Sequence, residues 1–200
     1  MTKITNFTVD DIRFPTSKDL TGSDAIHTDP DYSATYVTVY TSENNLKGFG
    51  LAFTIGKGND IVAACIKHFF PLFIGKTLDE LEKDIGKLWF QCVDHSQLRW
   101  LGPEKGVVHM AVAAIFNSLW DLIAKKNEKP LWQFVVDSKP DTIMEWLRLS
   151  ILKMYYQKMK LIKFYKIVRV QRNTESKKFL AKDTHLIQRQ LVGLVTQMKK

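Results

Sequence analysis

The spacing of apolar residues changes once along this chain, near residue 56, and that change limits the possible folds more than any other feature. Before it, apolar or β-branched residues alternate with polar ones in three segments, residues 4–14, 34–41 and 47–54. Alternation of period two predicts strands. A turn at residues 43–45 joins the last two segments, so we expect an antiparallel meander. Gly48 and Gly50 predict a close backbone approach or a bulge in the third strand.

The first helix is expected to begin at Asn59, which suits an N-cap, and to run to about Phe73. Its buried face is predicted to hold the apolar and weakly polar residues Ile61, Ala64, Cys65, His68 and Phe69.

Further helices follow from capping and periodicity. Thr77 and Glu80 have the spacing of a capping box before a second helix. A third helix is predicted over residues 107–126, and a short fourth one over residues 131–137 behind Pro130. The predicted fold class is therefore α+β, a three-stranded antiparallel meander followed by a bundle of three or four helices.

Charge divides the chain into two unlike parts. Residues 1–147 carry 15 Lys and Arg against 19 Asp and Glu, a net charge of −4. Residues 148–200 carry 14 basic residues against two acidic ones, a net charge of +12. We therefore predict a body over 1–147, which is not expected to bind nucleic acid, and a basic tail over 148–200. The alternative for the tail is a basic helix that binds a membrane surface or nucleic acid.

Cysteine content and the first residues bear on the compartment. Cys65 and Cys92 are too few for a disulfide framework, which favours a reducing compartment, the cytoplasm by default. The N-terminal residues lack the features of a signal peptide or a transit peptide. No run of eighteen apolar residues occurs, so no membrane span is expected.

The body contains three weak signals for chemistry. Cys65 and His68 are three apart on a predicted helix, but zinc needs three or four ligands, so packed core residues are favoured over a metal site. The stretch Gly56-Lys57-Gly58 precedes a helix and suits an anion, although it lacks the spacing of a Walker loop and a plain turn is favoured.

The third signal is the long polar loop over residues 15–32. Within it, His27 and Asp29 suit a base and its orienting carboxylate, but no nucleophile lies nearby, so a turn-forming role is favoured. Farther along the chain, Arg99 and Glu104 are predicted to form an ion pair in the loop before the third helix.

Three longer strings carry a resemblance. They are residues 23–33 (Ser-Asp-Ala-Ile-His-Thr-Asp-Pro-Asp-Tyr-Ser), 53–59 (Phe-Thr-Ile-Gly-Lys-Gly-Asn) and 97–109 (Gln-Leu-Arg-Trp-Leu-Gly-Pro-Glu-Lys-Gly-Val-Val-His). They resemble the N-terminal part of the L-fuconate dehydratases, in the mandelate racemase-like branch of the enolase superfamily. The similarity extends from about Lys3 to about Asp137.

The resemblance implies an N-terminal cap that closes over a (β/α)-barrel. In such enzymes the barrel holds the acid and base groups and binds magnesium, which stabilises the enediolate formed when a sugar acid loses a proton. The cap supplies loops that face the substrate. On this chain the resemblance makes His27, Asp29 and Lys57 the candidates, and it makes a mitochondrial location an alternative to the cytoplasm.

The chain departs from this family after the cap. Only 63 residues follow Asp137, whereas such a barrel needs roughly 250. We therefore expect no barrel domain, no catalytic residue, no metal ligand and no cofactor in this chain. A sugar acid would bind only with a barrel, and a full-length subunit is a possible partner.

The genetic code suggests an origin for the tail. Residues 154–160 and 185–199, back-translated and read one nucleotide earlier, give strings similar to those that follow the cap in this family. In most shifted codons two of the three bases are fixed. We therefore expect residues from about 150 onward to be an out-of-frame reading, non-native or disordered, produced by a deletion, alternative splicing, a sequencing error or a faulty gene model.

Overall fold

The computed structural model describes residues 1–98, 101 and 106–147. The chain divides into two units, Met1–Arg148 and Leu149–Lys200, and all described residues belong to the first. The predicted Arg99–Glu104 ion pair and the predicted tail, residues 148–200, lie outside the described residues.

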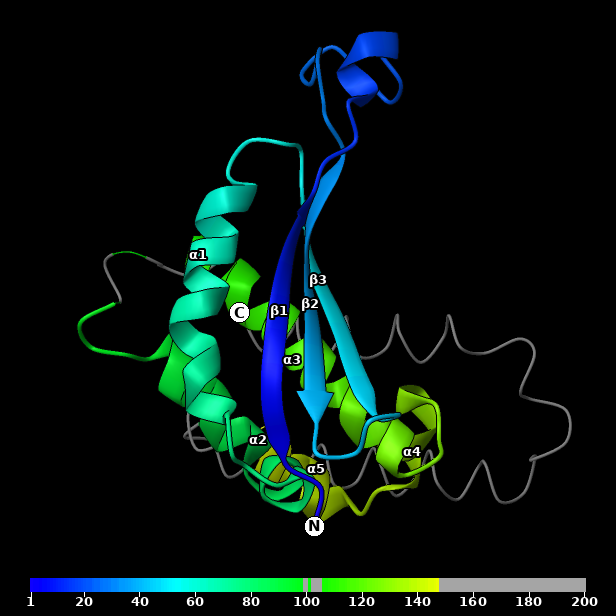
Figure 1. The fold of residues 1–200 in the computed structure, drawn as a ribbon, viewed down its shortest axis with the longest axis vertical. Helices are drawn as coiled ribbons and strands as arrows, with labels where there is room; N and C mark the ends of the chain where they lie inside the picture. Colours follow the sequence, from blue (N-terminus) through cyan, green and yellow to red (C-terminus); the bar gives the residue numbers. More distant parts are fainter. Residues whose placement is uncertain (99–100, 102–105, 148–200) are drawn as a thin grey trace, which may run out of the picture. The chain divides into compact units, whose positions relative to one another are not determined.

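Three strands form one antiparallel sheet in the order β1-β2-β3 (Figure 1). They are β1 (Ile4–Ile12), β2 (Ser33–Thr41) and β3 (Lys47–Thr54). The central strand sets the register, since Val37 lies opposite Val9 of β1 and Gly50 of β3. The predicted meander is confirmed.

Helices cover one face of this sheet. In chain order, the helices of the described residues are η1 (Thr16–Asp19), α1 (Asn59–Phe69), η2 (Phe70–Phe73), α2 (Leu78–Val93), α3 (Val107–Lys126), α4 (Leu131–Asp137) and α5 (Pro140–Trp146). α3 packs against β3 and β2, and α1 packs against β1 and β2. The predicted α+β fold is confirmed, and no closed barrel occurs among the residues that the structure describes.

The backbones of β3 and α3 lie in direct contact, with no side chain between them at two positions of β3. A Cβ atom added at Gly50 would lie 2.1 Å from the carbonyl oxygen of Ala114, and one added at Gly48 would lie 2.3 Å from that of Ser118. Only glycine fits at either position, which confirms the predicted close approach.

The predicted helix signals after α1 are confirmed, and one helix is added. Thr77 and Glu80 form the capping box, with the Glu80 amide 3.2 Å from Thr77 Oγ1 and the Thr77 amide 2.7 Å from Glu80 Oε2. The sequence prediction omits α5, although Pro140 in its first turn is a start signal. Trp146 anchors this helix by donating from Nε1 to the Glu82 carbonyl oxygen at 2.7 Å.

α1 begins at Asn59 as predicted, but the predicted N-cap role of Asn59 is wrong, and the predicted buried face is wrong except for Phe69. Gly58, with φ of 92°, is the N-cap, and the Asn59 side chain turns inward instead of capping. The buried side chains of α1 are Asn59, Val62, Ala63, Ile66 and Phe69. Apolar residues occupy two overlapping stripes of this helix, and the position of Asn59 against the sheet decides which stripe is buried.

α3 is long and apolar enough to cross a membrane by length and composition alone, and 61% of its apolar window is buried within the structure. A core helix has these same properties, and the helix predicted over residues 107–126 is confirmed.

We predict that Gly50→Ala lowers the free energy of unfolding by about 3 kcal/mol, because the added methyl group must separate α3 from β3. Gly58→Ala is the matched control, since Gly58 has a left-handed backbone but no atom within 4 Å of the added Cβ, so that strain alone costs about 1 kcal/mol. Urea unfolding of the two variants measures the difference. An equal decrease in the free energy of unfolding in Gly50→Ala and Gly58→Ala would contradict the close approach of α3 to β3.

Candidate functional site

Two loops meet at one end of the sheet. Residues 15–32 connect β1 to β2 and extend beyond the strands, and residues 55–58 connect β3 to α1 beside them (Figure 1). The Asp31 amide donates to the Ile55 carbonyl oxygen at 3.3 Å. A Cβ atom at Gly56 would lie 2.8 Å from Asp31 Cβ, so the two loops pack tightly together.

The longer loop is closed at its base by its own side chains. The Thr16 hydroxyl donates to the Pro30 carbonyl oxygen at 2.7 Å and accepts from the Tyr32 amide at 3.1 Å. The Ser17 amide donates to the Asp31 carboxylate at 3.1 Å. Hydrogen bonds from the Ser17 side chain and amide lower the pKa of Asp31, so this carboxylate stays ionised and keeps the base of the loop closed.

His27 lies in a tight turn organised by Asp24. One oxygen of the Asp24 carboxylate accepts from the amides of Ile26 and His27, both at 2.7 Å, and the other lies 3.2 Å from His27 Nδ1. The His27 amide, followed by that of Ile26, lowers the pKa of Asp24. The favoured turn-forming role is therefore supported.

The structure does not bring His27 and Asp29 together as a base and its orienter. Asp24 takes the orienting position, and the Asp29 carboxylate accepts from the Thr28 hydroxyl at 3.4 Å. His27, Asp29 and Lys57 are all exposed at this end of the sheet. A substrate-facing role for these three residues stays a prediction.

Asn59 connects the shorter loop to all three strands. The Thr54 hydroxyl of β3 donates to Asn59 Oδ1, and Asn59 Nδ2 donates to Asp11 of β1 at 2.8 Å. The Thr35 hydroxyl of β2 donates to the Asn59 carbonyl oxygen at 3.2 Å. The sequence analysis missed this role, because an asparagine at the start of a helix is also typical of an N-cap.

Asp11 connects the buried Asn59 side chain to Arg13, which is exposed at the surface. Its carboxylate accepts from Arg13 Nε at 3.0 Å and from Arg13 Nη2 at 2.8 Å. The hydrogen bond from Arg13, followed by that from Asn59, lowers the pKa of Asp11. The ionised carboxylate therefore holds Asn59 in place.

The weak metal signal finds no support in the structure. No group of three His, Cys, Asp or Glu side chains suited to a metal occurs in the described part of the chain. Burial, with a smaller contribution from Cys65, raises the pKa of Cys92 to about 12, so Cys92 is a packed thiol. Cys65 is half-buried, in agreement with the favoured prediction of a packed residue. His68 is exposed, so the prediction of a core residue is wrong for His68.

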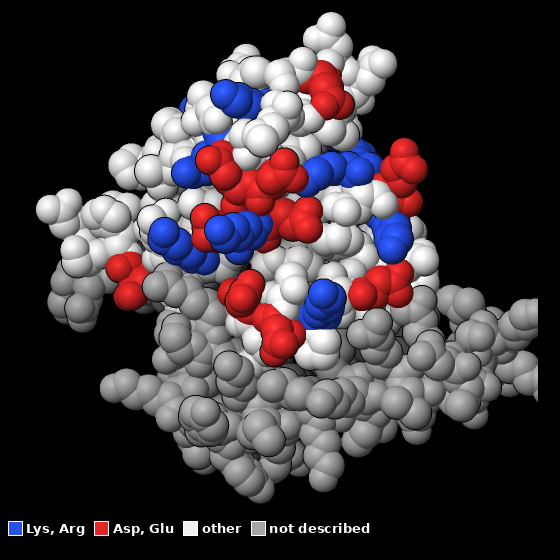
Figure 2. All heavy atoms as spheres, turned by 90° about the horizontal axis from the view of Figure 1, so that it is seen from below, with Lys and Arg blue, Asp and Glu red and all other residues white. Residues whose placement is uncertain are grey.

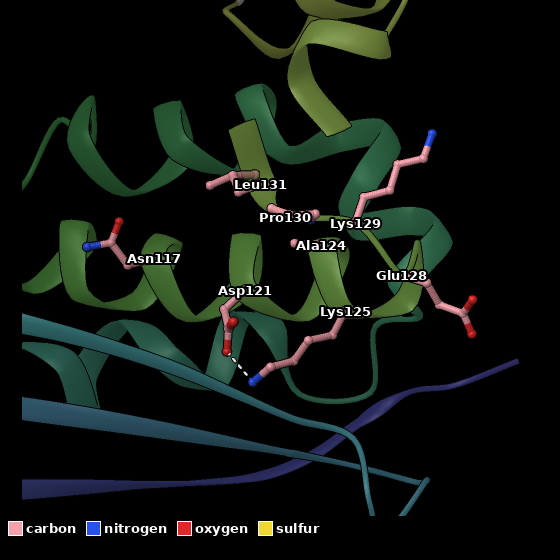
Figure 3. A pocket seen from close by; sticks show the side chains of 8 residues that line it. All are labelled: Asn117, Asp121, Ala124, Lys125, Glu128, Lys129, Pro130 and Leu131. Carbon is pink, nitrogen blue, oxygen red and sulfur yellow. Dashed lines mark hydrogen bonds and ion pairs between the residues drawn. The ribbon is translucent and has the colours of Figure 1, made fainter. Parts of the chain in front are cut away.

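A separate hollow of about 560 Å³ lies beside α3 and α4, among Asn117, Asp121, Ala124, Lys125, Glu128, Lys129, Pro130 and Leu131 (Figure 3). Two of its charged side chains, Asp121 and Lys125, are already bonded to β3. Asp121 accepts from the Phe49 amide at 2.9 Å, and Lys125 Nζ donates to the Lys47 carbonyl oxygen at 2.8 Å and to Asp121 at 2.6 Å. Because Asp121 and Lys125 bond to the backbone of β3, the hollow is a poor candidate for a ligand site.

Charges of both signs are interspersed on the face seen in Figure 2. Lys126, near the end of α3, forms ion pairs with Asp79 and Glu82 of α2. Such mixing is typical of a solvated surface, in contrast to the single-sign patch of a nucleic-acid interface.

Comparison with known families decides the assignment. Residues 21–135 match the model of the mandelate racemase / muconate lactonizing enzyme N-terminal domain. The chain belongs to the enolase superfamily. The match contains most of the 15–32 loop and all of the 55–58 loop.

Curated relatives of this enolase-superfamily chain include a dehydratase and animal proteins named for the superfamily. It is 51% identical over 138 residues to the L-galactonate dehydratase of Hypocrea jecorina, covering 69% of this chain and 30% of the relative. It is 47% identical over 143 residues to mitochondrial enolase superfamily member 1 of Bos taurus, covering 71% of this chain and 32% of the relative. The chain thus spans about a third of the length of these relatives.

Solved structures agree with the fold. The human mitochondrial enolase superfamily member 1 matches with a TM-score of 0.80 and 36% identity, covering 90% of this chain and 41% of that one. A Streptomyces coelicolor racemase with bound magnesium matches with a TM-score of 0.56 and 22% identity, over 68% of this chain and 36% of that one, a likeness of fold alone.

We predict that Arg13→Gln raises the pKa of Asp11 toward its ordinary value of 3.8, because the Arg13 hydrogen bond is the main cause of the lowered value. A lowered folded-state pKa stabilises the fold above the unfolded-state value, and the gain is lost as the pH falls through the folded-state value. As the pH falls below about 4, the free energy of unfolding of Arg13→Gln should therefore decrease less steeply than that of the wild type.

Carboxyl titration by nuclear magnetic resonance measures this pKa in each variant. Asp79, whose pKa is lowered by Lys126, is the internal control and should not change. An Asp11 pKa equal in the wild type and Arg13→Gln would contradict the network.

Proposed function

We propose that this chain is the cap of a sugar-acid dehydratase of the L-fuconate or L-galactonate class, and that it has no catalytic activity alone. The observation that carries this proposal is the 51% identity to an L-galactonate dehydratase over 138 residues. The family match over residues 21–135 includes most of the 15–32 loop and all of the 55–58 loop. A specific substrate-facing surface is the feature that a cap contributes to such an enzyme.

The geometry of the sheet end supports a cap role. The 15–32 and 55–58 loops are joined by the Asp31–Ile55 hydrogen bond and are held to the strands through Asn59. Loops with a rigid base and exposed tips suit substrate contact, since binding residues lie disproportionately on loops that a rigid scaffold positions. Lys57 would pair with the carboxylate of a sugar acid. The side chains of His27 and Asp29 would form hydrogen bonds with its hydroxyl groups.

Magnesium does not fit the described residues, because they contain no cluster of three possible ligands. The remaining residues, 99–100, 102–105 and 148–200, contain three acidic side chains in total, Glu104, Glu175 and Asp183. Hard cations such as magnesium prefer oxygen ligands, above all carboxylates. We therefore assign the metal of this enzyme class to the part of the relatives that this chain does not match.

Partner and compartment follow from the same proposal. The sugar acid would reach these loops only when a barrel lies beneath them, supplied by a full-length subunit. A mitochondrial location is supported by the names of the animal relatives and stays a prediction for this chain, as does the cytoplasmic alternative.

The test is a chimaera in which residues 1–137 replace the matching residues of the Hypocrea jecorina L-galactonate dehydratase. We expect this chimaera to dehydrate L-galactonate with magnesium, whereas the 200-residue chain alone shows no turnover. Activity of the chain alone would contradict the proposed inactivity. A folded but inactive chimaera would contradict the cap role.

The same chimaera tests Lys57. Lys57→Met should raise KM about tenfold and leave kcat nearly unchanged, because a charge-assisted contact made in both the ground and transition states is lost. Lys67→Met, an exposed lysine in the last turn of α1, is the matched control and should have no effect. Equal KM values in the two variants would remove Lys57 from the site.

A further inference from the structure

Tyr32 connects the outer part of the long loop to the sheet. We call residues 20–27 the loop tip; they belong to the 15–32 loop, which extends beyond the strands (Figure 1). Tyr32 directly precedes β2, and its ring stacks on that of Phe53 in β3, with 5.8 Å between the centroids and 25° between the planes. Its hydroxyl donates to the Gly22 carbonyl oxygen at 2.7 Å. One side chain therefore joins the loop tip to two strands.

The contact between Tyr32 and Gly22 is close as well as polar. Gly22 has φ of 75°, a backbone conformation that glycine adopts without strain. A Cβ atom added there would lie 2.4 Å from Tyr32 Cε2 and 2.7 Å from the Tyr32 hydroxyl oxygen. Both distances are much shorter than van der Waals contact, so the ring lies directly on the Gly22 backbone. This packing fixes the loop tip in addition to the hydrogen bond.

Two turns connect Gly22 to His27. The Ser23 amide donates to the Leu20 carbonyl oxygen at 3.1 Å, and the Asp24 amide donates to the His27 carbonyl oxygen at 2.9 Å. The Asp24 carboxylate accepts from the His27 amide at 2.7 Å and lies 3.2 Å from His27 Nδ1. Because these residues are bonded to one another, a displacement of Gly22 would displace the His27 ring as well.

Burial does not hold the loop tip. Its two large apolar side chains are exposed, Leu20 to 60% and Ile26 to 85%. A backbone hydrogen bond from the Thr21 amide to the Thr16 carbonyl oxygen, 3.1 Å long, ties the tip to η1. Tyr32 supplies the side-chain contact from the strand side, so its loss would leave the tip free to turn about its connection to η1.

We propose that Tyr32 is a positioning residue of the dehydratase, which holds the loop tip so that the His27 side chain meets a hydroxyl group of the sugar acid. The part played by His27 rests on the proposed function, whereas the contact between Tyr32 and Gly22 does not. Tyr32 acts through His27 and not on the substrate, because its hydroxyl is bonded to Gly22 and its ring lies against Phe53.

Amide hydrogen exchange of the 200-residue chain tests the contact without any catalysis. In Tyr32→Phe, which removes only the hydroxyl group, the amides of Ser23 and Asp24 should exchange about fivefold faster, because the hydrogen bond to Gly22 is lost. Tyr40→Phe is the matched control, since Tyr40 lies near the other end of β2, opposite Lys47, and it should leave both rates unchanged. Equal rates in the wild type and Tyr32→Phe would overturn the proposal.

The chimaera with the L-galactonate dehydratase tests the link to His27. Tyr32→Phe and His27→Ala should each raise KM for L-galactonate about fivefold with kcat nearly unchanged, because each loses the same hydrogen bond to the substrate. The double variant should have the KM of His27→Ala, since residues that act through one contact are not additive. Tyr40→Phe should leave KM unchanged.

A structural role of Tyr32 alone would give a different result, with the effect of Tyr32→Phe adding to that of His27→Ala. Additive effects, or an unchanged KM in Tyr32→Phe, would overturn the proposal and leave the cap role intact. A folded but inactive chimaera would contradict the cap role instead, and the exchange rates of Ser23 and Asp24 would still decide whether Tyr32 holds the loop tip.

Discussion

Asn59 is the residue on which the candidate site depends. It is completely buried, and its side chain and carbonyl oxygen are bonded to Asp11, Thr35 and Thr54, one residue from each strand. A buried amide without its partners costs about 1–3 kcal/mol, so these bonds hold the start of α1 in one place. The 55–58 loop immediately before Asn59 is placed by the same bonds.

Two further sets of contacts fix the structure on either side of Asn59. Toward the loop end, Asp31 joins the 55–58 loop to the 15–32 loop through Ile55, and Thr16 closes the longer loop at its base. Toward the body, the glycines of β3 bring α3 to backbone distance, so the sheet cannot tilt without separating from its main helix. The exposed residues His27, Asp29 and Lys57 are thus carried by loops whose bases are fixed, as a cap that faces a substrate would require.

Much of the fold could be predicted from the sequence, because local signals and tertiary packing agree there. The alternation in β2 and β3, the Thr77–Glu80 capping box and the small residues between β3 and α3 each have one structural meaning. The buried face of α1 could not be predicted, since Ile61 and Val62 are equally apolar and only the position of Asn59 selects between their stripes. α5 was missed because a seven-residue helix has little periodicity, and its stability comes from Trp146 against α2.

The site was predictable only in outline. The resemblance identified the two loops, but the hydrogen-bond partners depend on three-dimensional geometry. Asp24 rather than Asp29 lies against His27, because an aspartate that accepts from the amides two and three residues later forms a compact turn. Asn59 has no sequence signal that distinguishes a network residue from an N-cap.

Hydrogen bonds at this end of the sheet hold both loops in place within the described residues. Amide hydrogen exchange of the full chain, resolved residue by residue, tests this arrangement most directly. We predict slow exchange for the amides of Ser17, Asp31 and Tyr32, whose hydrogen bonds close the loops, and fast exchange at exposed positions such as Asp29. Unprotected exchange at all of these amides, with the strands still protected, would contradict this arrangement, because the loops would then need a partner to order them.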